Sequence, residues 1–214
     1  MARLILASAS PRRRELLTQA GFSFTVKAAD IDESVLPGED PEAYVTRLAR
    51  EKAQAVFRLE GRVTSDEGRG DDVVVLGADT TVVLDGEILG KPVDKADAMR
   101  MLRGLSGRTH RVITGVAVVS RRGVEVTAEV TEVRFREISD REIAEYVETG
   151  EPMDKAGAYG IQGRAGKWIP QIEGCYFNVM GLPLARVSAM LEEHDAGISH
   201  PSEHKSLAGD PGRE

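Results

Sequence analysis

Residues 4–17 read LILASASPRRRELL, a stretch in which a strand, a turn and a helix start follow one another closely. The apolar run predicts a buried strand over residues 3–7. Ser10 suits the N-cap of a helix and Pro11 its first position, so a helix is predicted over residues 11–20. A strand that passes through a short turn into a helix is typical of α/β domains.

Three consecutive arginines follow the proline, although a helix N-terminus is partly positive and disfavours each cation by ~0.3–1 kcal/mol. One interpretation is a solvated helix face, on which Glu15 supports the charges of Arg12, Arg13 and Arg14. The other is an anion site, because backbone N–H groups and hydroxyls of the turn converge there and guanidinium groups suit phosphate oxygens. The stretch alone leaves both interpretations open.

The composition argues against several classes of protein. The 214 residues are 41% hydrophobic and carry a net charge of −7, which disfavours a general nucleic-acid or membrane-surface binder. Aromatic residues make up only 5%, too few for a platform that stacks nucleic-acid bases. The single cysteine, Cys175, allows no internal disulfide and suits a reducing cytosol. No signal segment or membrane span is recognised, so we expect a cytoplasmic protein with no nucleic-acid or membrane partner.

Strand and helix patterns alternate along the rest of the chain, without an internal repeat. The predicted strands cover residues 24–28 and 73–78, a short hairpin at 81–84 and 87–89, and a long hairpin at 111–120 and 124–135. The predicted helices cover residues 40–56, 94–102, 140–148 and 182–193. The order indicates one α/β domain over residues 1–193, with a mixed twisted sheet and flanking helices. Residues 60–72 are predicted to form a surface loop, and residues 194–214 a disordered tail.

The segment LGADTTVVLDGEILGKP, residues 76–92, places a carboxylate and a lysine on either side of the short hairpin. We expect Asp79 where a buried strand ends, either capping the turn at Thr80 or taking part in chemistry. The hairpin can return Lys91 towards Asp79. A carboxylate that holds Mg²⁺ or activates water, with a lysine that offsets phosphate charge, fits metal-assisted hydrolysis.

Carboxylates also gather in DIDES, residues 30–34. The segment is either a polar loop or a source of a Mg²⁺ ligand, for which Glu33 is the preferred candidate. Lys52 lies in the helix predicted over residues 40–56 and would, on its own, be a solvated lysine.

Five glycines occur within GEPMDKAGAYGIQGRAG, residues 150–166. Such density indicates either a flexible loop or a loop whose backbone closely approaches a ligand. In the second case Lys155 could meet phosphate, and the amide of Gln162 could read a base edge. His110 is interpreted as structural, and Cys175 as a small core residue.

Eight segments together make the chain resemble the Maf family of nucleoside triphosphate pyrophosphatases, first linked to septum formation. They run in order from Leu4 to about Leu184: LILASASPRRRELL, DIDE, YVTRLAREKA, LGADTTVV, ILGKP, AMRMLRGLSGRTHRVITGV, YVETGEPMDKAGAYGIQG and IEGCYFNVMGLPL. The resemblance implies an elongated, two-lobed α/β fold with a central cleft, similar to inosine triphosphatase, and a homodimer. It also implies cleavage between the α- and β-phosphates of a nucleoside triphosphate, with Mg²⁺ or Mn²⁺ as cofactor.

The resemblance further implies roles for particular residues. Asp79 corresponds to the catalytic base and, with Glu33, to the ligands of the metal. Lys52 and Lys91 correspond to catalytic lysines. The remaining positions correspond to residues that bind the substrate: Ser8, Arg12, Arg13, Thr80, Lys155 and Gln162.

The substrate class can be inferred from the same comparison. One branch of the family carries Ala-Asp-Thr at the catalytic motif and acts on dTTP and UTP, whereas another carries Ser-Asp-Gln and acts on 7-methyl-GTP. Residues 78–80 of this chain are Ala-Asp-Thr, with Arg12 and Gln162 at the other discriminating positions. The resemblance therefore implies hydrolysis of dTTP and UTP, with modified pyrimidine nucleotides as further candidates, in house-cleaning of nucleotide pools and in cell-division arrest.

A different class of function stays open beside the enzyme. The chain could be a nucleotide-binding regulator of septum formation with little catalysis. The presence of Asp79, Glu33, Lys52 and Lys91 together disfavours this alternative, because a binder needs no carboxylate that activates water.

Overall fold

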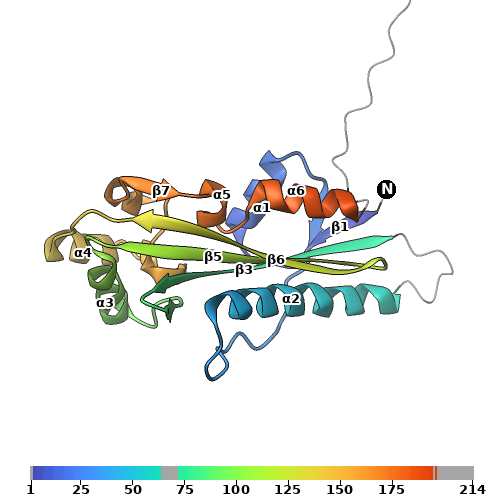
Figure 1. Cartoon of the computed structure of the whole chain (residues 1–214), viewed down its shortest axis with the longest axis horizontal. Coiled ribbons are helices and arrows are strands. Elements are labelled where there is room, and N and C mark those ends of the chain that lie inside the picture. Colours follow the sequence, from blue (N-terminus) through green and yellow to red (C-terminus); the bar gives the residue numbers. More distant parts are fainter. Residues whose placement is uncertain (1, 64–71, 195, 197–214) are drawn as a thin grey trace, which may run out of the picture.

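The computed structural model describes residues 2–63, 72–194 and 196 of the chain. The described part is elongated, with the strands of one sheet running along the long axis (Figure 1). Most of the loop predicted over residues 60–72, and the predicted tail after residue 194 apart from residue 196, lie outside the described residues.

One mixed sheet of seven strands organises the molecule. The strands are β1 (Arg3–Leu6), β2 (Phe24–Val26), β3 (Val73–Leu84), β4 (Glu87–Leu89), β5 (Thr109–Ser120), β6 (Gly123–Arg134) and β7 (Gln171–Glu173). Their order is β2-β1-β3-β5-β6-β7, and β4 pairs with β3. β1 is parallel to β2 and β3, whereas all other pairs are antiparallel. The mixed sheet and the long β5–β6 hairpin confirm the predicted fold class.

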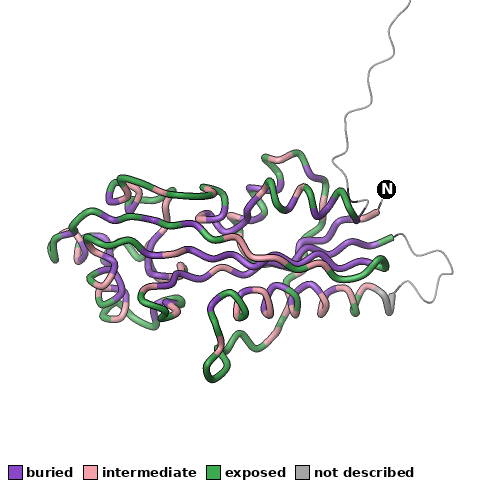
Figure 2. The backbone as a smooth tube through the Cα atoms, in the orientation of Figure 1, coloured by how far each residue is buried: buried purple, intermediate pink, exposed green. Residues whose placement is uncertain are grey.

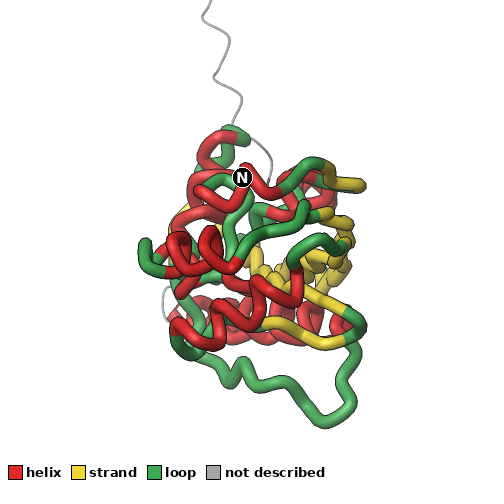
Figure 3. Tube along the Cα trace, turned by 90° about the vertical axis from the view of Figure 1, so that its left-hand side faces the viewer, coloured by secondary structure: helices red, strands yellow, loops and turns green. Residues whose placement is uncertain are grey.

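Helices cover both faces of the sheet (Figures 1 and 3). The long helix α2 (Pro41–Val63) packs along one face against β3 and β5, and α1 (Pro11–Gln19), α5 (Tyr176–Val179) and α6 (Leu184–Glu193) lie over the other. Helices α3 (Lys95–Leu105) and α4 (Asp140–Val147) pack together at one end of the sheet. None of the helices in the described part of the chain has the length and apolarity needed to cross a membrane.

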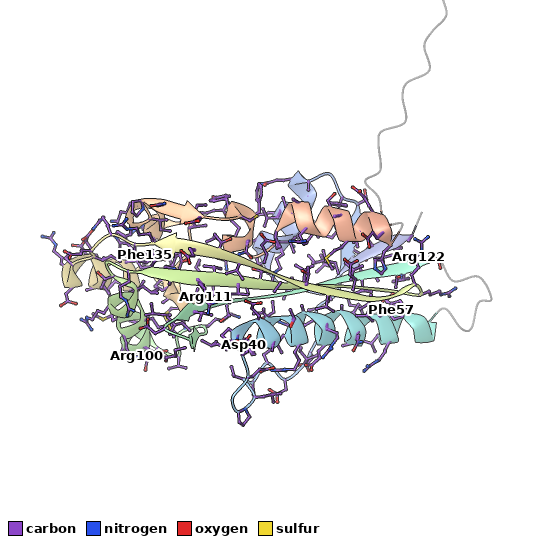
Figure 4. All side chains as sticks on the ribbon, in the orientation of Figure 1. Asp40, Phe57, Arg100, Arg111, Arg122 and Phe135 are labelled. Atoms are coloured by element: carbon purple, nitrogen blue, oxygen red, sulfur yellow. The ribbon has the colours of Figure 1, made fainter. Side chains whose placement is uncertain are left out.

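The buried side chains form separate cores towards the two ends of the sheet. One core gathers around Phe135 and Trp168 at the end that carries α3 and α4. At the other end one core lies beneath α1 and α6, and a second, which Phe57 borders, lies beneath α2. Figure 4 shows Phe135 and Phe57 far apart along the long axis, and Figure 2 shows buried backbone along the sheet between them. The two predicted lobes therefore share one sheet.

The two largest differences from the predicted element boundaries lie in β3 and α2. β3 was expected to end before Asp79, but it is continuous, because residues 75–83 all pair with β5. Asp79 therefore lies within a strand, and the expectation of a strand end or turn cap there is wrong. Helix α2 continues past residue 56 to Val63, and Glu60 on its last turns forms ion pairs with Arg3 and Lys27.

The sequence analysis missed two short elements, β7 and α5, since three or four residues alone carry no readable period. Cys175 stands at the N-cap of α5 and is half-exposed, so its interpretation as a core residue is wrong.

His110 is buried in the core around Phe135, in agreement with its interpretation as structural. Its Nε2 lies 2.7 Å from the hydroxyl of Tyr159, and among the described residues its Nδ1 has no hydrogen-bond partner. Burial lowers the pKa of His110 to about 4, because the apolar core disfavours the charged form of the ring.

This pKa predicts a loss of stability in mild acid. The unfolded chain takes up the proton of His110 near pH 6.5 and the folded chain only near pH 4, so the unfolded state binds more protons in between. Urea unfolding at pH 7 and pH 4.5 should show that the wild type loses about 2 kcal/mol more than His110→Gln. Equal losses in the two proteins would contradict the assignment.

Candidate active site

A gap along one edge of β3 creates the candidate site. β1 pairs with β3 as far as Leu76, and β4 pairs with it only from Val82 onward. On that edge, no strand of the described chain pairs with residues 77–81. A cleft of about 780 Å³ opens there, lined by residues of the β1–α1 turn, β3, the 151–163 segment and the 179–181 segment.

All ten residues that the sequence analysis singled out line this one cleft: Ser8, Arg12, Arg13, Glu33, Lys52, Asp79, Thr80, Lys91, Lys155 and Gln162. They come from positions up to 154 residues apart, since the cleft collects the ends of several elements. Arg14 is exposed on α1 and is not among the lining residues. The structure thus brings the predicted residues together, while their individual roles stay predictions.

A chain of three charges lies at the centre of the cleft. The ammonium of Lys52, on α2, is 2.7 Å from Oδ1 of Asp79 and 2.7 Å from Oε1 of Glu33. Lys52 and Asp79 are both 8% exposed, whereas the side chain of Glu33 is 53% exposed at the mouth. The lysine therefore neutralises a buried carboxylate and holds an exposed one beside it.

Two glycines let α2 approach the sheet closely enough for this contact. An ideal Cβ at Gly77 would lie 2.2 Å from the carbonyl oxygen of Ala49, and one at Gly115 would lie 2.3 Å from that of Val45. Asp79 lies two residues beyond Gly77, on the same face of β3, and is paired in register with Gly115. Any side chain at these glycines would push α2, and Lys52 with it, away from Asp79.

Arg13 lies in the site as a buried group with several hydrogen bonds to the protein. Its Nε donates to the carbonyl of Gly181 at 2.8 Å, and its Nη1 to that of Ala78 at 2.8 Å and to Oγ of Ser8 at 3.2 Å. Its Nη2 donates to Oγ1 of Thr80 at 2.9 Å. Burial lowers the pKa of Arg13, and the nearby Asp79 carboxylate opposes that shift. Four of the five N–H groups of an arginine are thus used within the protein.

The glycine-rich segment is an ordered series of 3₁₀ turns, Glu151–Asp154, Ala156–Ala158 and Arg164–Trp168. Glu151 fixes it, because its carboxylate accepts the backbone N–H of Arg164 at 3.1 Å and the hydroxyl of Tyr146 at 3.0 Å. Lys155 donates to the carbonyl of Glu151 and to Asp154, each at 2.6 Å. The segment is therefore built against the cleft, which favours the ligand-binding interpretation over a flexible loop.

The remaining predicted cations lie at the rim. Arg12 is half-buried at the start of α1, and Lys91 is exposed after β4. Neither forms an ion pair with another residue of the described ranges. Gln162 is also exposed and lines the cleft, where its amide can meet a ligand.

The sequence analysis missed the residues that hold the acidic loop. Tyr44 lines the cleft and donates its hydroxyl to the carbonyl of Glu33 at 3.0 Å. Burial, with the charges of Asp79 and Glu33, raises the pKa of Tyr44 to about 12, so the phenol stays neutral. Tyr44 lies eight residues before Lys52, two helical turns on one face, and this spacing could have identified it. Arg47 donates to the carbonyl of Ser34 at 3.0 Å.

The donors present fit a hard divalent cation that takes most of its ligands from elsewhere. No group of three or more metal-binding side chains occurs within the described ranges. Mg²⁺ in enzymes that act on phosphates is commonly held by one or two carboxylates together with substrate oxygens and water. Glu33 and Asp79, which both form ion pairs with Lys52, provide such a pair of carboxylates.

A comparison with known proteins adds to this geometry. The family model described as "Maf-like protein" matches residues 3–194. The chain belongs to the Maf family. It is 55% identical over 193 residues to the dTTP/UTP pyrophosphatase of Hahella chejuensis, covering 89% of this chain and 92% of that protein. It is 54% identical to the dTTP/UTP pyrophosphatases of Anaeromyxobacter dehalogenans, over 94% of this chain and 97% of that protein, and of Koribacter versatilis, over 91% and 95%.

The close packing at Gly77 makes a testable prediction about this Maf protein. Gly77→Ala should lower the free energy of unfolding by ~1–3 kcal/mol, because the added methyl meets helix backbone that cannot rotate away. A crystal structure of the variant should show a longer distance between Nζ of Lys52 and Oδ1 of Asp79.

Gly104→Ala is the matched control. A Cβ there meets only the side chain of Leu84, at 3.5 Å, so this variant should be at least as stable as the wild type. Urea unfolding of the three proteins makes the comparison, and equal stability of the two variants would contradict the packing argument.

Proposed function

We propose that this chain hydrolyses dTTP and UTP to the nucleoside monophosphate and pyrophosphate. The observation that carries the proposal is the buried Asp79, held by Lys52 in a cleft that also collects Arg12, Lys91 and Lys155. A carboxylate surrounded by cations suits the attack of water on a polyanion. The names of the relatives reported above, and the Ala-Asp-Thr at residues 78–80, support dTTP and UTP as substrates.

In the proposed reaction Asp79 accepts a proton from a water molecule as the water oxygen bonds to phosphorus. The bond between the α- and β-phosphates breaks, and pyrophosphate leaves with the electron pair. Lys52, already bound to Asp79, holds that carboxylate in place and offsets its charge. The positions of the two groups are fixed by α2 and β3, so little reorganisation is needed when the substrate arrives.

The rim cations stabilise the charge on the triphosphate and on the departing pyrophosphate. Arg12 and Lys91 project from different lobes, so a nucleotide that meets both would bridge the cleft. Positioned cations aimed at developing charge are often the largest contribution to such chemistry.

A divalent cation, Mg²⁺ or Mn²⁺, fits the same site. Glu33 and Asp79 would hold it, and the exposed position of Glu33 would let substrate oxygens complete its ligand shell. Such an ion, when bound, neutralises phosphate charge and polarises the phosphorus towards attack.

The first test is release of pyrophosphate from dTTP, UTP, CTP, GTP and 7-methyl-GTP, each with Mg²⁺, with Mn²⁺ and with EDTA. We expect turnover of dTTP and UTP above the others, and its loss in EDTA. Preference for 7-methyl-GTP would retain the reaction and overturn the substrate assignment. A folded protein that turns over none of these nucleotides would instead favour the binding regulator.

The second test separates chemistry from binding. Asp79→Asn keeps the size of the side chain but removes its basicity, so kcat should fall by about 10²–10⁴-fold. Binding of a non-hydrolysable dTTP analogue, measured by calorimetry, should change little by comparison. Equal losses of kcat and of affinity in a folded variant would count against the role of Asp79 as base.

A further inference from the structure

The motif IEGCYFNVMGLPL was part of the family resemblance, but the proposed function gives it no role. It forms β7, α5 and the turn after α5. Three of its residues, Val179–Gly181, line the cleft, and we call them the cleft wall. Val179 packs against the core around Phe135, whereas Met180 belongs to the core beneath α1 and α6. The cleft wall therefore spans the two lobes.

A one-way chain of hydrogen bonds connects Arg13 to the segment just before the cleft wall. Nη2 of Arg13 lies 2.9 Å from Oγ1 of Thr80, which lies 2.9 Å from Oγ1 of Thr114. Thr114 is 3.1 Å from the carbonyl oxygen of Asn178. Arginine can only donate and a carbonyl can only accept, so the arrangement that uses all three contacts has each threonine accept from one neighbour and donate to the next. Oγ1 of Thr80 also lies 3.5 Å from the carbonyl oxygen of Gly181 in the cleft wall.

Further hydrogen bonds hold Asn178, the last residue of this hydrogen-bond series. Nδ2 of Asn178 donates to the carbonyl of Val112 at 3.0 Å and to Oγ1 of Thr131 at 2.9 Å. Oγ1 of Thr131 also accepts the N–H of Cys175 at 3.0 Å and donates to its carbonyl at 3.1 Å. Thr114, Thr131 and Asn178 are completely buried, so a broken bond here would leave a polar group without water.

We propose that Thr114 and Asn178 are positioning residues for the nucleotide, because they hold the cleft wall at its Asn178 end, while Arg13 holds its other end through the carbonyl of Gly181 at 2.8 Å. This inference rests on the proposed function. Oγ1 of Thr80 accepts from Arg13, and its single hydrogen has acceptors within the protein, Oγ1 of Thr114 and the carbonyl of Gly181. The threonine of the Ala-Asp-Thr motif therefore influences the choice of nucleotide through the cleft wall rather than by a hydrogen bond from its hydroxyl to the base.

The two faces of β3 keep this effect apart from the chemistry. Asp79 points to the face covered by α2, where it meets Lys52, and Thr80 points to the opposite face. Loss of a hydrogen bond in this series should thus alter nucleotide binding and discrimination more than kcat, the rate of hydrolysis in the bound complex.

The test compares Thr114→Val with two matched variants. Valine has the shape of threonine but no hydroxyl, so Thr114→Val removes the hydrogen bonds of this side chain to Thr80 and Asn178 without opening a cavity. Thr114→Ser keeps the hydroxyl and should rescue the chain. Thr127→Val makes the same change on β6, on the face of the sheet that also carries Thr114. Thr127 is half-buried and is not among the residues that line the cleft.

Two measurements are made on all four proteins: steady-state kinetics with dTTP, UTP and 7-methyl-GTP, and calorimetric binding of a non-hydrolysable dTTP analogue. For Thr114→Val we expect KM for dTTP and the Kd of the analogue to rise about 10-fold, the effect of one lost buried hydrogen bond. The ratio of kcat/KM for dTTP over 7-methyl-GTP should fall by a similar factor, with kcat changed less than about 3-fold. Thr114→Ser and Thr127→Val should stay within about 2-fold of the wild type.

The outcomes distinguish this inference from the proposed function. If Thr114→Val binds the analogue and discriminates among nucleotides as Thr127→Val does, the positioning role is overturned. If Thr114→Val loses kcat equally for all nucleotides with unchanged ratios, it is overturned as well. A wild type that binds the analogue but hydrolyses no nucleotide overturns the proposed function alone, and the Kd values still decide the role of Thr114.

Discussion

The close approach of helix α2 to the sheet is the constraint on which the site depends. At Gly77 and Gly115 the helix backbone occupies space that any side chain would fill, so α2 can approach β3 and β5 closely there. The ammonium of Lys52 reaches Asp79 only at this separation. Glycine weakens a strand, by roughly 0.5–1 kcal/mol against alanine. The chain carries two glycines in its central strands despite this cost, and both allow the contact between Lys52 and Asp79.

A second constraint is the interrupted edge of β3. In a complete sheet the side chains on opposite faces of a strand serve different environments. Here β1 stops at Leu76 and β4 begins at Val82, so the strand is open between them and both faces border one cleft. Asp79 and Thr80 are neighbours in sequence and point in opposite directions, yet both line that cleft. Arg13 occupies part of the missing strand's place by donating to the carbonyl of Ala78.

Much of this arrangement could be predicted from the sequence, because caps, turns and alternation are local. Ser10 and Asp94 cap helices as expected, and the long hairpin turns at residues 121 and 122. The continuity of β3 could not be predicted, because the polar ADTT resembles a strand end until its pairing with β5 is known. The tight packing at Gly77 was equally invisible, since the helix that it contacts is more than twenty residues away in sequence.

The three arginines at the start of α1 show why residue type alone does not fix a role. The unfavourable charge at a helix N-terminus is relieved differently for each. Arg14 is exposed to water. Arg12 lies at the rim, where a bound polyanion would offset it. Arg13 is withdrawn into the protein, where carbonyls and hydroxyls accept its N–H groups and Asp79 opposes its charge. Four protein partners hold this guanidinium at the cleft, and its role in binding the substrate stays a prediction. The choice between a solvated face and an anion site therefore does not describe all three arginines. One run of arginines contains a solvated residue, a candidate phosphate ligand and a buried organiser of the cleft.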